Sequence, residues 1–323
     1  MPGVPDSISL PARTLRLGTR GSLLAQAQSG WVAREVEAKN PGVRVELVVI
    51  STSGDQIQDV PLHAFGGKGL FTKELELALL AGTVDFAVHS FKDVPVTMPL
   101  VDASDLVIAA VPPREDPRDA WVTADGGGAA LDALPAGARV GTGSLRRRSQ
   151  ILARRPDLVV GPVRGNIDTR LRKLRDGEFD AVVLAAAGLK RAGLFDAARM
   201  APIDPAVMLP APGQGALALQ CRRDDAGCRA ALAALHDPAT AACVELERDV
   251  VRGLDGDCHS PIAAYATLAD GRVALRAAVG ARDGDPPVIA AAAAAAMNEA
   301  GRAVVELLAN LERQGARELL SPA

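Results

Sequence analysis

Short apolar runs alternate with segments of helical periodicity along the first two thirds of the chain, and this alternation limits the possible fold more than any other feature. The first set has apolar runs at 15–20, 43–52 and 85–90, with helical patterns at 23–40 and 70–81. The second set has apolar runs at 139–141, 158–160 and 181–185, with helical patterns at 144–155 and 166–175. Such alternation is typical of βαβ units on a mainly parallel sheet. The sequence therefore predicts two α/β domains.

The pattern changes in the last third of the chain. A helical pattern at 239–252, strands such as 272–279 and a final helix from about 298 to 314 predict a smaller α+β domain. The run 290–296 consists of alanine alone, and we interpret it as part of a helix near the C-terminus. Two segments rich in proline or glycine, 111–117 and 208–216, are candidate linkers.

Charge and hydropathy exclude several classes of protein. The 323 residues include 36 basic and 39 acidic side chains, and the net charge of −3 removes the global attraction of a non-specific nucleic-acid binder. No apolar run approaches the ~20 residues of a membrane span. The first residues lack the basic and apolar regions of a secretory signal. We therefore expect a cytoplasmic protein with neither nucleic acid nor membrane as a partner, whose anion sites are local.

The four cysteines are Cys221, Cys228, Cys243 and Cys258. Their spacing matches neither a C-x-x-C zinc site nor a small disulfide scaffold, so no metal is expected. We expect at least one to be a reactive thiol and the others to be buried as small hydrophobic residues.

Arginine occurs in three turns that follow predicted strands, namely 19–22, 141–148 and 164–170. Open α/β sheets bind their ligands at this edge, beyond the carboxyl ends of the strands. In the second turn Ser144 is the expected N-cap, and Arg146 and Arg147 occupy the first helical turn, where a cation opposes the helix dipole by roughly 0.3–1 kcal/mol. An anionic ligand would remove that objection, so the turns indicate a ligand with several carboxylates or phosphates. A solvated basic surface is the alternative. In either case we expect Arg146 and Arg147 to be surface residues that contribute little to stability.

A second cluster of polar residues ends the strand predicted at 85–90, where His89, Ser90, Lys92 and Asp93 follow one another closely. An ionised Asp93 near cations could stabilise a developing positive charge or pass a proton. In the alternative interpretation, His89 is a hydrogen-bonded core residue and Lys92 and Asp93 form a surface ion pair.

Two further motifs contain glycine. The segment 66–69, GGKG, resembles a phosphate-binding loop but lacks the Walker spacing, and we expect a mobile loop over a cleft. In the turn 253–261, Cys258 stands beside His259, an arrangement that a cysteine-nucleophile hydrolase could use. The acidic neighbours Asp255 and Asp257 disfavour a thiolate there.

Taken in order, these motifs resemble the porphobilinogen deaminase family. The matching segments are GTRGS (18–22), GGKGLFTKELE (66–76), DFAVHSFKDVP (85–95), REDPRDA (114–120), GTGSLRRR (141–148), RGNIDTRL (164–171), LPAPGQGA (209–216) and GDCHSPIAAYA (256–266). The resemblance implies a transferase of tetrapyrrole (haem) biosynthesis. Such an enzyme condenses four porphobilinogen units head to tail, with loss of ammonia, to hydroxymethylbilane.

The resemblance also implies an architecture. It consists of two α/β domains like type 2 periplasmic binding proteins, with mixed, mainly parallel sheets, and a smaller α+β C-terminal domain. Domain 1 would comprise residues 1–113 and 214–235, domain 2 residues 114–213, and the C-terminal domain residues 236–323. We expect a monomer.

By the same resemblance, Asp93 is the catalytic carboxylate, and Cys258 is the covalent attachment point of a dipyrromethane cofactor made from two substrate units. Cofactor contacts are implied for Lys92, Ser144, Arg146, Arg147 and Arg170. Substrate contacts are implied for Arg20, Ser22, Arg164, Arg191 and Lys68, the last from the loop over the cleft. A competing interpretation is a non-catalytic, two-lobed anion-binding or sensory module, which the cysteine-bearing third domain counts against.

Overall fold

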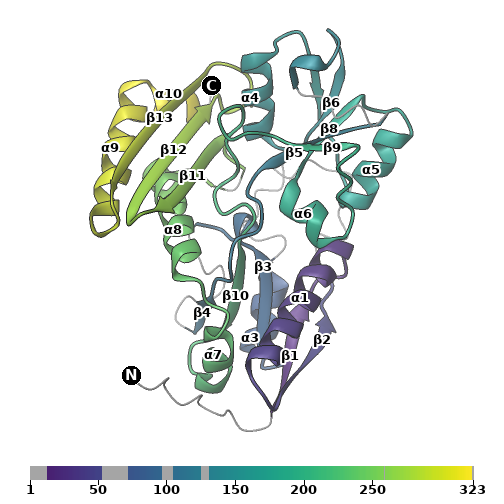
Figure 1. Cartoon of the computed structure of the whole chain (residues 1–323), viewed down its shortest axis with the longest axis vertical. Helices are drawn as coiled ribbons and strands as arrows, with labels where there is room; N and C mark the ends of the chain where they lie inside the picture. Colours follow the sequence, from purple (N-terminus) through teal and green to yellow (C-terminus); the bar gives the residue numbers. More distant parts are fainter. Residues whose placement is uncertain (1–12, 53–71, 97–104, 125–130, 258, 322–323) are drawn as a thin grey trace.

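The first of three sheets lies at one end of the molecule, below the other two in Figure 1. The computed structural model describes residues 13–52, 72–96, 105–124, 131–257 and 259–321. The first sheet has the order β2-β1-β3-β10-β4, formed by β1 (Arg13–Thr19), β2 (Val43–Val49), β3 (Phe86–Ser90), β4 (Leu106–Ala110) and β10 (Leu217–Arg222). Only β10 runs antiparallel to its neighbours. The associated helices are α1 (Leu23–Lys39), α3 (Lys73–Leu80) and α7 (Ala226–Ala233), and we call this unit the first lobe.

A second sheet repeats this strand order. Its order is β7-β6-β8-β5-β9, formed by β5 (Asp119–Thr123), β6 (Arg139–Gly141), β7 (Val159–Gly161), β8 (Ala181–Ala185) and β9 (Met200–Pro202). Here β5 is the antiparallel strand. With α4 (Leu145–Arg154), α5 (Ile167–Arg175), α6 (Ala186–Arg191) and the 3₁₀ turn η3 (Leu131–Ala133), this sheet forms the second lobe. The predicted mixed, mainly parallel sheets are confirmed in both lobes.

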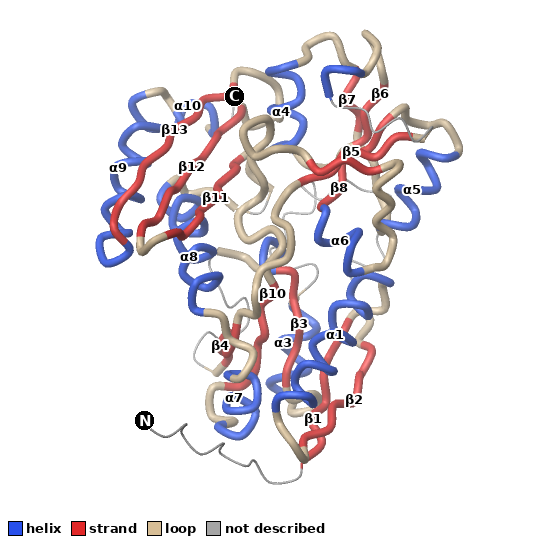
Figure 2. Tube along the Cα trace, viewed as in Figure 1, coloured by secondary structure: helices blue, strands red, loops and turns tan. Residues whose placement is uncertain are grey.

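Two irregular segments, 111–118 and 203–216, connect the lobes, and they are the tan tubes between the sheets in Figure 2. They contact each other closely, since the amide of Glu115 donates to the carbonyl of Gly215 at 3.1 Å. Gly215 has a φ of +88°, and a Cβ there would lie 2.3 Å from the carbonyl oxygen of Glu115. Only glycine fits this position. Both candidate linkers lie within these connecting segments.

The C-terminal domain is an antiparallel sheet covered by helices, as expected for an α+β unit. Its elements are α8 (Pro238–Gly253), β11 (Ile262–Ala269), β12 (Arg272–Gly280), β13 (Val288–Ala296), the 3₁₀ turn η4 (Met297–Glu299), α9 (Ala300–Arg313) and α10 (Ala316–Leu320). The helix predicted for the alanine run is wrong, because residues 290–296 belong to β13 and pair with β12. Ala293 and Ala295 alternate with exposed neighbours and are buried in the core beneath α9.

Three of the four cysteines are buried, as expected for small hydrophobic residues: Cys221, Cys228 and Cys243. The fourth, Cys258, lies outside the described residues, as does the glycine loop 66–69. Among the helices that the structure describes, none is both long and apolar enough to cross a membrane.

Candidate active site

A cleft of about 290 Å³ lies between the two lobes. Its lining includes eight of the residues that the sequence singled out, namely Arg20, Ser22, Lys92 and Asp93 from the first lobe and Arg147, Arg164, Arg170 and Arg191 from the second. The lobes also approach closely here. Leu24 of the first lobe and Gly188 of the second both line the cleft, and a Cβ added to Gly188 would lie only 3.5 Å from the Leu24 side chain. Residues from three separate βα turns therefore meet in one cavity.

Four of the predicted site residues do not line this cleft in the described structure. Ser144 and Arg146 lie outside its lining, and Lys68 and Cys258 are outside the described residues. Ser144 is the predicted N-cap of α4, and its Oγ accepts a hydrogen bond from the amide of Arg147 at 3.4 Å. Ser144 thus orients the start of the helix that carries Arg147.

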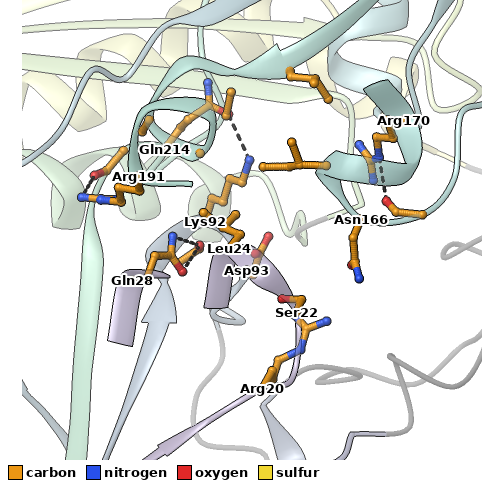
Figure 3. A pocket seen from close by; sticks show the side chains of 18 of the residues that line it. Arg20, Ser22, Leu24, Gln28, Lys92, Asp93, Asn166, Arg170, Arg191 and Gln214 are labelled. Atoms are coloured by element: carbon orange, nitrogen blue, oxygen red, sulfur yellow. Dashed lines mark hydrogen bonds between the residues drawn. The ribbon is translucent and has the colours of Figure 1, made fainter. Parts of the chain in front are cut away.

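Asp93 ends a single 3₁₀ turn, η2 (Phe91–Asp93), directly after β3. Its side chain is exposed and lines the cleft together with Ser22 (Figure 3). The turn is anchored to the second connecting segment, because the amide of Phe91 donates to the carbonyl of Ala216 at 3.0 Å. The chain therefore presents an accessible carboxylate on a fixed backbone.

Lys92, next to Asp93, is half-buried, and its Nζ donates to Oε1 of Gln214 at 3.3 Å. Burial lowers the pKa of Lys92 to about 8, against an opposing effect of the nearby Asp93 carboxylate. This ammonium is thus charged at neutral pH and loses its proton in the mildly alkaline range.

The predicted surface location of Arg146 and Arg147 is wrong. Both side chains are buried against Asp119 at the start of β5, with Nη1 of Arg146 2.8 Å from one carboxylate oxygen and Nη2 of Arg147 2.8 Å from the other. Arg146 also donates to the carbonyl of Leu209 at 2.6 Å, and Arg147 to the carbonyl of Val183 at 2.9 Å. Burial opposes ionisation of Asp119, but the two guanidinium groups outweigh it and lower its pKa. An acid that the sequence did not single out therefore balances the charge at this helix start.

Gln214 is a second residue that the sequence did not single out by itself, although it belongs to the motif at 209–216. It is fully buried, and its Nε2 donates to Asp119 and to the carbonyl of Pro117, both at 2.8 Å. Its Oε1 accepts from Lys92. One amide thus joins the Lys92–Asp93 turn of the first lobe to the buried acid of the second.

The arginines opposite Asp93 are held by main-chain carbonyls. Nε of Arg170 donates to Gly165 at 2.8 Å, and Nη2 of Arg191 donates to Gly215 at 2.9 Å (Figure 3). The pKa of both is lowered to about 10, by burial in each case and, for Arg170, also by the nearby cations Arg147 and Arg164. Arg147 and Arg164 therefore repel Arg170, and a bound polyanion would relieve that repulsion.

His89 is a core residue, in agreement with the alternative interpretation. It is buried, its Nε2 lies 2.9 Å from Oε1 of Gln220, and burial lowers its pKa to about 4. Closer to the cleft, Gln28 of α1 donates to Oγ of Ser90 at 3.0 Å, and both line the cavity. Ser90 and Gln28 thus extend the polar surface beside Lys92.

Of the described residues that line the cleft, five are arginines, one is a lysine and Asp93 is the one carboxylate. Fold and cleft together define a two-lobed α/β protein whose cleft has the charge to suit a ligand with several acidic groups. Residues 15–230 match the family model described as porphobilinogen deaminase, dipyromethane cofactor binding domain, and residues 241–313 match its C-terminal domain. The chain belongs to the porphobilinogen deaminase family.

A relative named porphobilinogen deaminase, from Syntrophobacter fumaroxidans, is 54% identical over 273 residues, which cover 84% of this chain and 86% of the relative. Among solved structures, the periplasmic VFT2 domain of BvgS from Bordetella pertussis has a TM-score of 0.38 at 15% identity, covering 69% of this chain and 86% of that one. The probable amino-acid transporter binding protein YtmK of Bacillus subtilis has a TM-score of 0.41 at 10% identity, covering 68% and 89%.

Family membership establishes the activity. The chain is a transferase that acts on a small molecule, condensing four porphobilinogen units with loss of ammonia to hydroxymethylbilane. The alternative interpretation as a non-catalytic anion-binding or sensory module is therefore not favoured.

Proposed function

We propose that Asp93 is the catalytic carboxylate of this deaminase and that the arginines around it hold the carboxylates of cofactor, substrate and growing chain. One observation carries the proposal: Asp93 faces the same interlobe cleft as five guanidinium groups from three βα turns and α6. Porphobilinogen carries two carboxylates, so each added unit brings further negative charge into the cleft. Arginine suits such a ligand because its planar fork matches a carboxylate.

Loss of ammonia breaks the bond between the aminomethyl carbon and nitrogen and leaves an electron-poor azafulvenium cation. An ionised carboxylate beside the pyrrole N–H stabilises that charge where it develops. After the new carbon–carbon bond has formed, the same carboxylate can accept a proton from the ring system. Asp93 is exposed to the cleft and backed by a fixed turn, as both tasks require.

Direct contacts to the cofactor are assigned to Lys92, Arg147 and Arg170, and direct contacts to the substrate to Arg20, Ser22, Arg164, Arg191 and Lys68. Ser144 and Arg146 support the cofactor site indirectly. Ser144 caps α4, and Arg146 shares Asp119 with Arg147. This division follows the family resemblance, and the position of Arg147 in the cleft supports it.

The residues present fit a dipyrromethane. Two joined pyrrole units carry four carboxylates, and the described cleft supplies cations with one acid among them. When bound, the cofactor supplies the pyrrole carbon to which the first substrate unit is joined. We assign its covalent attachment to Cys258, whose thioether makes each condensation intramolecular and prevents escape of intermediates. The neighbouring Asp257 holds the turn by accepting from the amides of His259 and Ser260, both at 2.9 Å.

The remaining assignments are also proposals. Domain 1 comprises residues 1–113 and 214–235, domain 2 residues 114–213, and the C-terminal domain residues 236–323. The return of β10 to the first sheet supports the discontinuous first domain. We further propose a cytoplasmic monomer that binds neither nucleic acid nor membrane.

Asp93→Asn tests the catalytic assignment, since it removes the negative charge at nearly constant volume. In cofactor-loaded enzyme, kcat should fall by roughly 10²–10⁴-fold while KM changes little. Asp132→Asn is the control, because Asp132 is an exposed acid of the second lobe that pairs with Arg154 outside the cleft. A kcat for Asp93→Asn within a few-fold of the wild-type value would move the catalytic role to another residue.

A further inference from the structure

The turn that carries Asp93 is also contacted by the C-terminal domain. Helix α8 presents Val244 and Arg248, which are one turn apart and therefore share a face. Val244 is fully buried in a cluster with Phe91 and Val94. The contact continues beyond Val94, because Val96 packs against the hydrophobic core of the C-terminal domain.

Arg248 makes the polar part of this contact. It is buried, and its Nη1 and Nη2 donate to the main-chain carbonyls of Val94 and Pro95 at 2.9 and 2.8 Å. Its guanidinium carbon also lies 5.0 Å from the centre of the Phe91 ring. One side chain therefore contacts the chain on both sides of Asp93, through the Phe91 ring before it and two backbone carbonyls after it.

A buried guanidinium is costly, and an apolar side chain of similar volume would fill the same space at a lower desolvation cost. The nearby acids of α8, Glu245 and Asp249, instead pair with Arg252. What Arg248 adds is geometry, since two N–H groups fixed in one plane reach two successive carbonyls. A lysine cannot reproduce that fork.

We propose that Arg248 is a positioning residue that holds the Lys92–Asp93 turn in its working geometry from the C-terminal domain. The inference rests on the proposed catalytic role of Asp93. The same turn is also held by the second connecting segment, since the amide of Phe91 donates to Ala216 and Nζ of Lys92 donates to Gln214. The carboxylate thus has one support from the interlobe connection and one from the domain that contains Cys258.

Arg248→Met removes the fork and keeps most of the volume. We expect kcat to fall roughly ten- to a hundredfold, because a displacement of about 1 Å at a reacting group has effects of that size, while KM changes less than threefold. The kcat of Arg248→Lys should lie between those of the wild type and Arg248→Met. Arg252→Met, on the same helix one turn later, is the control and should retain wild-type kcat.

A double-mutant cycle separates positioning from a general loss of structure. Asp93→Glu moves the carboxylate by one methylene and should lower kcat by itself. If Arg248 acts through Asp93, the variant with both substitutions should be within about threefold of Asp93→Glu alone, since the losses are shared. The inference would be overturned if the decreases in kcat of Arg248→Met and Asp93→Glu multiplied in the double variant, and if Arg248→Lys combined with Asp93→Glu multiplied in the same way. Asp93→Glu and Asp93→Asn at wild-type kcat would instead refute the catalytic role of Asp93.

Discussion

Arg147 donates two hydrogen bonds, from Nε and Nη2, to a single carboxylate oxygen of Asp119 at 3.1 and 2.8 Å, while its side chain also lines the interlobe cleft. Arg147 is therefore a ligand-facing residue whose orientation depends on a buried acid. Substitution at either position should affect both stability and function.

The fold depends on Asp119. Asp119→Asn leaves the buried guanidinium groups of Arg146 and Arg147 without an acid, and loss of one partner of a buried ion pair costs about 3–5 kcal/mol. Arg147→Leu should cost less, because Asp119 retains Arg146 and Gln214. Urea unfolding of cofactor-free protein measures both losses.

Arg154→Gln is the matched control for that experiment. Arg154 is on the same helix, α4, but pairs with Asp132 at the surface. Its unfolding midpoint should equal that of the wild type. An Asp119→Asn protein as stable as this control would show that the buried pair contributes nothing to the fold.

Acid should weaken the fold through two aspartates. Burial opposes ionisation of Asp119 and Asp116, yet Arg146 and Arg147 beside the first, and Arg118 beside the second, lower their pKa values, to about 2 for Asp116. Because the folded-state pKa lies below the unfolded value of 3.8, this stabilisation is complete above about pH 5 and is lost progressively as the pH falls through 3.8 toward 2. Urea midpoints at pH 5, 4 and 3 should decrease in that order. If the urea midpoint of Asp119→Asn falls less than that of the wild type over this pH range, Asp119 is one of the groups responsible. An equal fall in the two proteins would exclude Asp119.

Arg170 should matter for function and not for folding. The neighbouring cations Arg147 and Arg164 repel it, so Arg170→Leu should leave stability unchanged or slightly higher. Loss of a charge-assisted contact to a carboxylate weakens binding by roughly 1.5–3 kcal/mol, or ten- to over a hundredfold. We expect cofactor attachment to proceed and elongation to stall, with enzyme-bound intermediates separated by charge on a native gel.

Arg172→Leu removes the same charge from an exposed position of the same helix, α5, and should turn over normally. Equal stalling in both variants would mean that the overall charge of α5, rather than the position of Arg170 in the cleft, controls elongation.

Lys92 is assigned to the cofactor, but its ammonium also adds to the positive charge that attracts incoming substrate to the cleft, so substrate binding should be sensitive to alkali. Its pKa is lowered to about 8 by burial, so the ammonium loses its proton above that pH and attracts carboxylates less. Bound carboxylates oppose this loss, so KM for porphobilinogen should begin to rise at or above pH 8. In Lys92→Arg, which stays charged, KM should be constant across the same range. Parallel KM profiles for the two proteins would assign the dependence to another group.

Local periodicity was sufficient to predict the two α/β lobes, because each βα unit shows its own pattern of apolar residues. It also predicted that the turns after β6 and β7 lie together, since the carboxyl ends of parallel strands share one sheet edge. That the turn after β1, in the other sheet, faces them depends on how the two lobes pack. The alanine run was misinterpreted because identical residues carry no periodicity. Pairing with β12, from Ala278 opposite Ala290 to Arg272 opposite Ala296, decides its structure.

The burial of Arg147 could not be inferred from its own helix. Its partner Asp119 lies 28 residues away in the sequence, and the contact between Arg248 and Val94 spans 154 residues. Helix position predicted an exposed cation, whereas tertiary packing supplied a buried acid. The first contact depends on how α4 packs against β5 within the second lobe, and the second depends on how the C-terminal domain packs against the first lobe. No local pattern encodes either arrangement.

The intact mass of the purified protein tests the central claim most directly. The account predicts a single species heavier than the sequence by two pyrrole units, with the added mass on the peptide that contains Cys258 and a pink colour with acidic p-dimethylaminobenzaldehyde. Cys258→Ser should have the unmodified mass and no activity, whereas Cys243→Ala should keep the added mass. An active protein with the mass of its bare sequence would contradict the account.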